Sequence, residues 1–452
     1  MSLSQGLATA IFLGMFIAII VGKIHRYIPA LIGAALTVIV VFLAVMRSPD
    51  VVWTVLNLEQ LGQSTFWLPG HESIASHGVN WQTIVFIGGM MAMVEGLNEA
   101  GFFRWLCLFV AKRLNYRVVP IFIAFMVLSG FLSMFIDSIT VLLFLASVTV
   151  ELGRLLKFDP VPLIIAEIAA ANIGGSATMS GDPPNIIIGT AFGYTFRDFA
   201  TNTGPIAWVG MILVVGLFYF MFRKSLTKAK PESVPTDNKY PEPKEAIANQ
   251  KLFLIQSAIF VFVIILLVTH AETGISVALI GVIAAVLTVL ATGKRAPHVV
   301  KRLDWRTLLF FVGLFICVGG LEQTGVLKMM ADGIRNTSGG NLVSVMSIIL
   351  WMSAFLSAIV DNIPFAATMV PVIANLSATT GVPLPTLAWT LALGTDIGGN
   401  ATPIGASANV VGTAIAEREG YPIGWGRFCK YSFPAMIVVV AVVHLLLVVR
   451  YT

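Results

Sequence analysis

Two stretches of this chain decide its fold: GGSATMSGDPPNIIIG, from Gly174 to Gly189, and GGNATPIGASANVVG, from Gly398 to Gly412. Each lies within apolar sequence but carries paired glycines, proline and small polar residues, which cannot continue a helix through lipid. Broken backbone is tolerated at that depth only where it is buried in protein or lines a cavity. A close helix crossing would explain the glycines but not the density of Asn, Thr and Asp. We therefore expect two broken membrane helices whose oxygens bind a ligand.

The two stretches belong to an internal duplication. A shift of 224 residues aligns Trp81–Ile188 with Trp305–Gly412 without a gap, and 25 of the 108 aligned positions are identical. The identities cluster at glycine and polar positions, where chance apolar similarity would not place them. SGFLSMFIDSI at Ser129–Ile139, for example, matches SAFLSAIVDNI at Ser353–Ile363.

The duplication divides the chain into a first repeat at 1–222 and a second at 251–452. The segment between them, 223–250, is rich in Lys, Glu and Pro and has no apolar face. Such a composition predicts a solvated connector on the cytoplasmic side.

The composition predicts a membrane protein, since 57% of the 452 residues are hydrophobic and only 11% are charged. Soluble domains carry about a quarter charged residues. The net charge of +5 comes from basic residues in short loops, so no nucleic-acid surface is expected. Cys107, Cys317 and Cys429 lie far apart and show no metal-site spacing, so no metal is expected.

The runs Val118–Phe135 and Val141–Leu152 fit either two full spans or one re-entrant hairpin with Asp137 at its tip. With a hairpin, each repeat has five spans, an odd number, so the second repeat is inverted. The loops on one side then hold 23 of the 28 Lys and Arg residues, which makes that side cytoplasmic. Two full spans in place of the hairpin would put the loops on the same sides, so the charge count alone does not distinguish them. The polar residues at the tips favour the hairpin. We predict an all-α polytopic membrane protein with about ten spans, two re-entrant hairpins and both termini extracytoplasmic.

Asp137 and Asp361 each place a carboxylate in the middle of apolar sequence. A carboxylate in hydrocarbon is costly and marks an ion or substrate path. It can also cap the second helix of the hairpin by accepting backbone N–H bonds, and the two roles are compatible. We expect both tips to line the site. Neither tip nor either broken stretch contains Lys or Arg, so none of these segments neutralises a bound anion.

Three further acids, Glu167, Asp182 and Asp396, lie within membrane sequence and are candidates to carry a proton or a cation. For Glu167 a structural hydrogen-bonding role is an equal alternative.

These paired motifs resemble the ion transporter superfamily, and most closely the permeases that include the ArsB arsenical pump, the NhaD antiporters and the melanosomal P protein. The resemblance covers nearly the whole chain. It implies a motif-bearing domain that moves as an elevator within a scaffold, in a prokaryotic cytoplasmic (inner) membrane. It implies no cofactor beyond a coupling ion, H+ or Na+. It admits a homodimer and an ArsA-type ATPase as partners, beside a small inorganic solute.

The ligands that the resemblance implies are small polar and acidic residues of the tips and broken stretches: Asp137, Ser138, Thr140, Ser176, Thr178, Asn185, Asp361, Asn362, Asn400, Thr402, Ser407 and Asn409. The two half-sites are chemically unequal, because Thr140 aligns with Pro364 and Asp182 aligns with Ala406.

The leading hypothesis is a secondary transporter that exports arsenite or antimonite in exchange for protons, which confers arsenical resistance. Sodium/proton antiport and sodium-coupled transport of an anion such as a carboxylate are the alternatives, and a channel is a weaker one. No nucleophile–base pair, metal-ligand cluster or nucleotide motif favours an enzyme, so no catalytic residue is expected.

Overall fold

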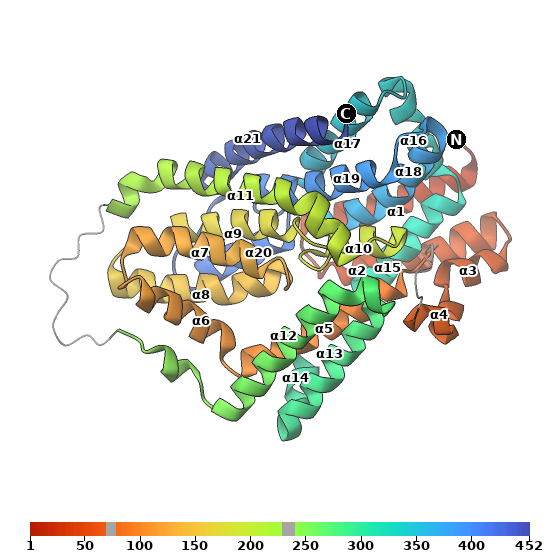
Figure 1. The fold of residues 1–452 in the computed structure, drawn as a ribbon. Coiled ribbons are helices and arrows are strands. Elements are labelled where there is room, and N and C mark those ends of the chain that lie inside the picture. The colour runs from red at the N-terminus through yellow and green to blue at the C-terminus, as the bar shows by residue number, and fades with distance from the viewer. Residues whose placement is uncertain (69–77, 228–239) are drawn as a thin grey trace.

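The computed structural model describes residues 1–68, 78–227 and 240–452, and the regular elements within these ranges are all helices (Figure 1). Among the described residues, nine helices are long and apolar enough to cross a membrane. Two of the nine, α8 (Ser138–Leu156) and α18 (Asn362–Thr380), are the second arms of helical hairpins. The prediction of an all-α polytopic membrane protein is confirmed.

The first half of the chain contains α1 (Leu3–Val21), α2 (Tyr27–Leu36) continuing as a π-helix (Thr37–Val45), α3 (Pro49–Leu56), α4 (Ser64–Trp67), α5 (Trp81–Glu99), α6 (Phe102–Arg113), α7 (Val118–Leu132), α8, α9 (Val161–Gly175), α10 (Pro183–Phe192) and α11 (Phe196–Thr227). The second half contains α12 (Gln250–Thr273), α13 (Val277–Thr292), α14 (Ala296–Arg302), α15 (Trp305–Gln323), α16 (Val326–Ser338), α17 (Leu342–Ser357), α18, α19 (Leu384–Gly398), α20 (Ser407–Arg418) and α21 (Trp425–Tyr451).

The two halves have opposite orientations. Figure 1 shows both chain ends on the right of the molecule, whereas the end of α11 lies at the far left. We call the side with the chain ends the terminus face and the side with the end of α11 the linker face. The first hairpin, α7–α8, opens toward the linker face, and its counterpart α17–α18 opens toward the terminus face.

Each hairpin turns at the aspartate that the sequence singled out. In the first tip, residues 133–138, Asp137 caps α8 by accepting the Thr140 N–H at 3.1 Å. In the second tip, residues 358–362, Asp361 caps α18 by accepting the Ile363 N–H at 3.2 Å. A capping carboxylate satisfies one of the four amides that have no partner within the helix. This explains why each hairpin reverses here.

Glycine lets the first arm of each hairpin cross a broken helix at backbone contact. A Cβ on Gly174 of α9 would lie 2.1 Å from the Gly130 carbonyl oxygen of α7. The matching position in the second half, Gly398 of α19, would place a Cβ 2.3 Å from the Ala354 Cα of α17. The glycines therefore permit a close helix crossing, which is one of the two roles considered for them in the sequence. The crossing lies beside the polar residues described below.

The helices pack as two bodies. The scaffold consists of α1, α2, α5, α12, α13 and α15, in which α5 packs along α13 and α15 packs along α2. The core bundle consists of α7–α11 and α17–α21, in which α7 packs on α9, α17 on α19 and α8 on α20.

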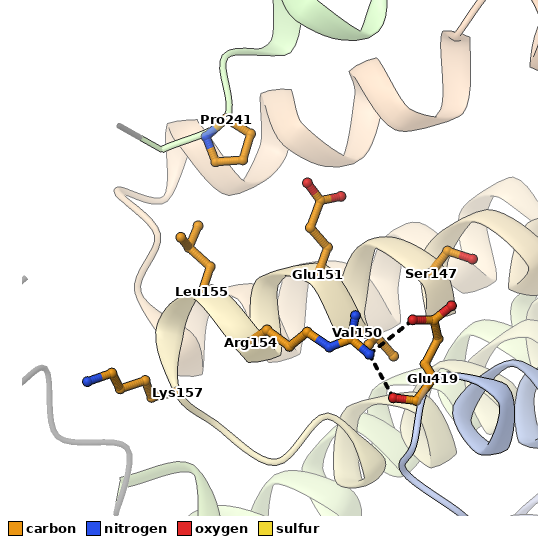
Figure 2. Close-up of a pocket in the computed structure, with 8 residues that line it drawn as sticks. All are labelled: Ser147, Val150, Glu151, Arg154, Leu155, Lys157, Pro241 and Glu419. Atoms are coloured by element: carbon orange, nitrogen blue, oxygen red, sulfur yellow. Dashed lines mark hydrogen bonds and ion pairs between the residues drawn. The ribbon is translucent and has the colours of Figure 1, made fainter. Parts of the chain in front are cut away.

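Several ion pairs stay within one body. Figure 2 shows a linker-face pocket of about 490 Å³, where Arg154 of α8 contacts the Glu419 carboxylate at 3.0 Å and donates to its backbone carbonyl at 2.7 Å. This contact ties the first hairpin to the end of α20. Within the scaffold, Arg302 reaches Glu95 at 3.0 Å in the same way.

Part of the predicted linker contacts α6 while its charged side chains stay exposed. Helix α11 continues past Phe222 to Thr227, and residues 228–239 lie outside the described residues. Beyond them, Tyr240 stacks on Tyr116 at 4.2 Å, and the Tyr116 hydroxyl donates to the Pro241 carbonyl at 2.7 Å. Two tyrosines thus supply a packing contact at the end of the predicted connector.

Candidate functional site

One carboxylate joins both hairpin tips to a broken helix. Asp182 immediately precedes α10, and its Oδ1 accepts a hydrogen bond from the Ser138 hydroxyl at 2.8 Å. Its Oδ2 accepts one from Asn362 Nδ2 at 2.5 Å. Ser138 and Asn362 are the first residues of α8 and α18 and occupy equivalent positions in the two repeats. Asp182 therefore lies where the two halves meet, and all three side chains are buried.

A second buried cluster consists of amides. Asn172 near the end of α9 donates to Asn400 Oδ1 at 2.8 Å and to Asn409 Oδ1 at 2.9 Å. Asn409 Nδ2 in turn donates to the Gly399 and Thr402 carbonyls, both at 2.7 Å. The amides thus bind the broken stretch of the second repeat to α9 of the first.

The equivalent position in the other repeat has different chemistry. Asp396 aligns with Asn172 in the duplication, and Asn185 aligns with Asn409. Asn185 Nδ2 donates to the Gly175 and Thr178 carbonyls, both at 3.0 Å, as Asn409 does in its own stretch. Asp396, however, has no N–H to donate. Neither of its carboxylate oxygens has a hydrogen-bond partner among the described residues.

Some of the expected ligands hold the broken stretches against the tips. The Thr178 hydroxyl donates to the Met134 carbonyl of the first tip, and the Thr402 hydroxyl donates to the Ala358 carbonyl of the second. Ser176 bonds within its own stretch, to the Ile173 carbonyl at 2.7 Å. These hydroxyls therefore position the tips, and their protons are already engaged.

An arginine from the scaffold reaches the second tip. Arg26, just before α2, donates to Asp361 Oδ2 at 3.1 Å and to the Ser407 hydroxyl at 2.7 Å. Its other terminal nitrogen donates to the Thr307 hydroxyl of α15 at 2.9 Å. The Ser407 hydroxyl also donates to Asp361, at 2.8 Å. The expectation that no basic residue neutralises charge at the tips was therefore incomplete, because the cation comes from a distant segment.

The first tip has no such partner in the described contacts. Asp137 accepts from the backbone and the hydroxyl of Thr140, the latter at 2.7 Å. The counterpart of Thr307 is Thr83, whose hydroxyl bonds Thr190 of α10 at 2.8 Å, and Asn80 donates to the same Thr190 at 2.8 Å. The boundary between core bundle and scaffold is therefore neutral near Thr190 and charged near Arg26.

Glu167 lies apart from these clusters. It is fully buried in α9, and its Oε1 accepts from the Thr149 hydroxyl of α8 at 2.5 Å. Its Oε2 has no hydrogen-bond partner. Of the three additional acids, Asp182 and Asp396 are brought together and Glu167 is not.

A cavity of about 510 Å³ separates the core bundle from the scaffold near the terminus face. Its walls come from α10 and α18 on one side and from the end of α15 and the start of α5 on the other. The lining residues Ile187 and Ala367 lie between one and two helical turns from Asp182 and Asn362 along α10 and α18. The cavity therefore approaches the joined tips from the terminus face, while Arg26 bridges the two bodies nearer the linker face.

Sequence reasoning missed Arg26, Thr307 and Asn172 as site residues. Arg26 lies in a short loop and resembles the other Lys and Arg residues of the predicted cytoplasmic loops, so nothing in the local sequence indicates a role in the site. Asn172 did carry a signal, because it aligns with Asp396 within the NIGGSAT and DIGGNAT stretches.

The inverted halves, the paired broken helices and the polar tips define a multi-pass secondary transporter. The chain belongs to the CitMHS citrate transporter family, whose pattern matches residues 16–394. An uncharacterised transporter of Mycobacterium tuberculosis is 33% identical over 446 residues, which cover 98% of each chain. The P protein of Homo sapiens is 30% identical over 526 residues, which cover 96% of this chain and 58% of that protein.

Among solved structures, the YdaH transporter of Alcanivorax borkumensis matches with a TM-score of 0.57 over 90% of this chain and 89% of that chain. At 14% identity this match shows a shared fold alone. The predicted resemblance to the ion transporter superfamily is confirmed.

Proposed function

We propose that this protein exports arsenite or antimonite across a prokaryotic inner membrane in exchange for protons, by an elevator movement of the core bundle against the scaffold. The terminus face is then extracytoplasmic. The observation that carries the proposal is the charge of the site: each tip carries an aspartate, buried Asp182 joins the two tips, and the guanidinium that reaches a tip is already paired.

The elevator mechanism is supported by the distribution of contacts. The ion pairs Arg154–Glu419 and Arg302–Glu95 hold each body together. Between the bodies, Arg26 meets Asp361, Thr190 meets α5, the exposed pair Arg197–Glu272 joins α11 to α12, and a cavity separates α10 and α18 from α15. When a rigid core bundle slides past a rigid scaffold, the contacts between the two bodies break and the contacts within each body remain.

The charge at the tips disfavours a lone anion. Asp137, Asp182, Asp361 and Asp396 are carboxylates, whereas Arg26 is the guanidinium that the described contacts bring to a tip, and Asp361 pairs with it. An unpaired charge transferred into protein costs several kcal/mol. Helix N-termini contribute only about half a positive charge each, and at α8 and α18 an aspartate already occupies the cap.

A neutral trihydroxy solute avoids that cost. Arsenous acid is such a species at neutral pH, and it needs only hydrogen-bond donors and acceptors. Ser, Thr and Asn side chains supply both, and Ser138, Asn362 and Ser407 lie at or beside the tips. Carboxylates that are not needed to bind the solute remain free to carry the exchanged proton.

A second candidate is cation-coupled transport of a carboxylate. It is favoured by the description of the family and by Arg26, since a guanidinium binds carboxylates in a bidentate geometry. In that reading the substrate displaces Asp361 from Arg26, and a bound cation offsets the remaining acids.

Accumulation of metalloid in cells separates the two candidates. We expect cells that lack their own exporters to accumulate less arsenite or antimonite when they express this protein, and an uncoupler to abolish the difference. Unchanged metalloid accumulation together with cation-dependent uptake of citrate would support the carboxylate candidate and contradict the first.

A further inference from the structure

Among the buried oxygen atoms of the core bundle that have no hydrogen-bond partner, three belong to two side chains that the duplication places together. They are Oδ1 and Oδ2 of Asp396 and Oδ1 of Asn185, and both side chains are fully buried. The orientation of the Asn185 amide is fixed, because its Nδ2 donates to two carbonyl oxygens, those of Gly175 and Thr178. In the other repeat, the residue at the position of Asp396 is Asn172, which lies within 2.9 Å of the counterpart of Asn185, so the duplication places the Asp396 carboxyl group beside the Asn185 amide oxygen. A buried acceptor without a donor costs about 1–3 kcal/mol, and more when it is charged.

The other repeat shows how the same frame is satisfied when a donor is present. There Asn172 stands in place of Asp396, and its Nδ2 donates to Asn409 Oδ1, the counterpart of Asn185 Oδ1. The two positions differ by the replacement of an amide NH2 with a carboxylate oxygen. A hydrogen atom on that oxygen would restore the missing bond.

We infer that Asp396 is the proton-carrying residue of this transporter: its protonated carboxyl group donates to Asn185 or Asp182, and its loss of the proton leaves the three oxygens facing one another. The Asn172 cluster does not ionise, so it holds the second broken stretch whether Asp396 is protonated or not. The inference rests on the proposed coupling to protons, and it selects one carrier among the buried acids.

The surroundings favour a single exchangeable charge at this position. Helices α10, α17 and α18 carry no titratable side chain, and Glu167 of α9 is directed to Thr149 of α8. Helices α11 and α21 also pack against α19, and among their charged groups several have other partners: Asp198 accepts from Thr195, Arg197 pairs with Glu272, His444 bonds Ser347 and Arg450 donates to the Thr201 carbonyl. Asp182 is the acid that immediately precedes α10, which packs on α19. Beyond Asp182 lie Asp137 and Asp361 at the two tips, the latter paired with Arg26.

Asp182 differs from Asp396 in its partners. Both of its oxygens accept hydrogen bonds, from Ser138 and Asn362, which stabilise it as a carboxylate. Asp396 has no such donors, so it is the member of the pair that gains by holding the proton. Divalent cations take about six oxygen ligands or more, and among the described residues no three His, Cys, Asp or Glu side chains converge as a metal site.

The test uses infrared difference spectroscopy of the full chain in lipid bilayers, recorded between two pH values without metalloid. Wild-type protein is expected to show a carboxylic-acid C=O band that titrates. Asp396→Asn is expected to lose that band and to retain its folded state, because the new amide can donate to Asn185 as Asn172 does to Asn409. The thermal unfolding temperature of this variant is expected to lose the pH dependence of the wild type.

Glu167→Gln is the matched control, since it removes another fully buried acid that lies apart from the cluster. It is expected to keep the band that Asp396→Asn loses. A band that persists in Asp396→Asn, or one that sodium at constant pH removes, would overturn the inference. Because no metalloid is present, the outcome does not depend on whether arsenite is the substrate.

Discussion

Asn172 and Asp396 occupy the same position of the two repeats, yet Asn172 donates two buried hydrogen bonds whereas neither oxygen of Asp396 accepts one. The same position of the duplicated motif is therefore an amide that always donates in one repeat and an ionisable carboxyl group in the other. Because only one of the two equivalent positions can ionise, movement of the core bundle can be coupled to a single ion site.

Replacement of Asn172 by alanine should destabilise the protein markedly. The change leaves Asn400 and Asn409 Oδ1 buried without their donor, at a cost of about 1–3 kcal/mol for each group. Thermal unfolding in detergent should show a clear drop in the midpoint. Asn375→Ala is the control, because the Asn375 amide donates only to Pro371 in its own helix, at 2.8 Å, and it should change the midpoint little. Equal midpoints for the two variants would refute the role of the amide cluster.

Loss of Arg26 should release the core bundle from the scaffold. In Arg26→Gln the guanidinium that bridges Asp361, Ser407 and Thr307 is gone, so the present state loses a partly buried ion pair. A single cysteine at Ala374, which lines the terminus-face cavity, should then react more slowly with a water-soluble maleimide, because the population shifts away from the state with this cavity.

The comparison requires a background without Cys107, Cys317 and Cys429. Arg302→Gln is the matched control, since Arg302 pairs with Glu95 inside the scaffold. It should leave the labelling rate unchanged. If both variants slowed labelling alike, the Arg26 contact would have no special part in holding the two bodies.

The crossing of α7 and α9 should tolerate no side chain at Gly174. An added Cβ would meet the Gly130 carbonyl oxygen at 2.1 Å, and overpacking of this kind costs about 1–3 kcal/mol or more. Gly174→Ala should therefore lower the yield of folded protein and its unfolding midpoint. Gly216→Ala in α11, where a Cβ would meet nothing within 4 Å, should be neutral or slightly stabilising. A stable Gly174→Ala protein would show that the crossing is looser than described.

The two faces should label from opposite sides of the membrane. Exposed Glu59 lies in the short 3-10 helix between α3 and α4, and exposed Lys244 lies in the described end of the linker. Cysteines at these positions should react with an impermeant reagent from outside and from inside the cell, respectively. Reaction of both from one side would contradict the inverted arrangement.

The sequence predicted the elements that depend on local chemistry. Glycine, proline and aspartate at fixed positions predicted the broken helices and the capped tips, and the duplication predicted which segments correspond. The partners of those residues were not predictable in the same way. Arg26 precedes Asp361 by hundreds of residues, and only the packing of α2 against α15 brings it to the second tip. The pairing of Asp182 with Asn362 likewise depends on how the two repeats face each other.

The function of the expected ligands could also not be deduced from residue type. Thr178 and Thr402 were expected to bind a ligand, but the structure engages their hydroxyls with tip carbonyls. Hydroxyl groups serve equally well for either purpose, so the sequence alone does not distinguish them.

The measurement that tests the account most directly is uptake of labelled arsenite into proteoliposomes of the purified full chain with an imposed pH gradient. With an acidic lumen, we expect arsenite to accumulate above its external concentration, an uncoupler to dissipate it, and Asp396→Asn to abolish the accumulation. No accumulation of arsenite or antimonite under this gradient, in vesicles that accumulate citrate in response to a cation gradient, would contradict proton-coupled metalloid export.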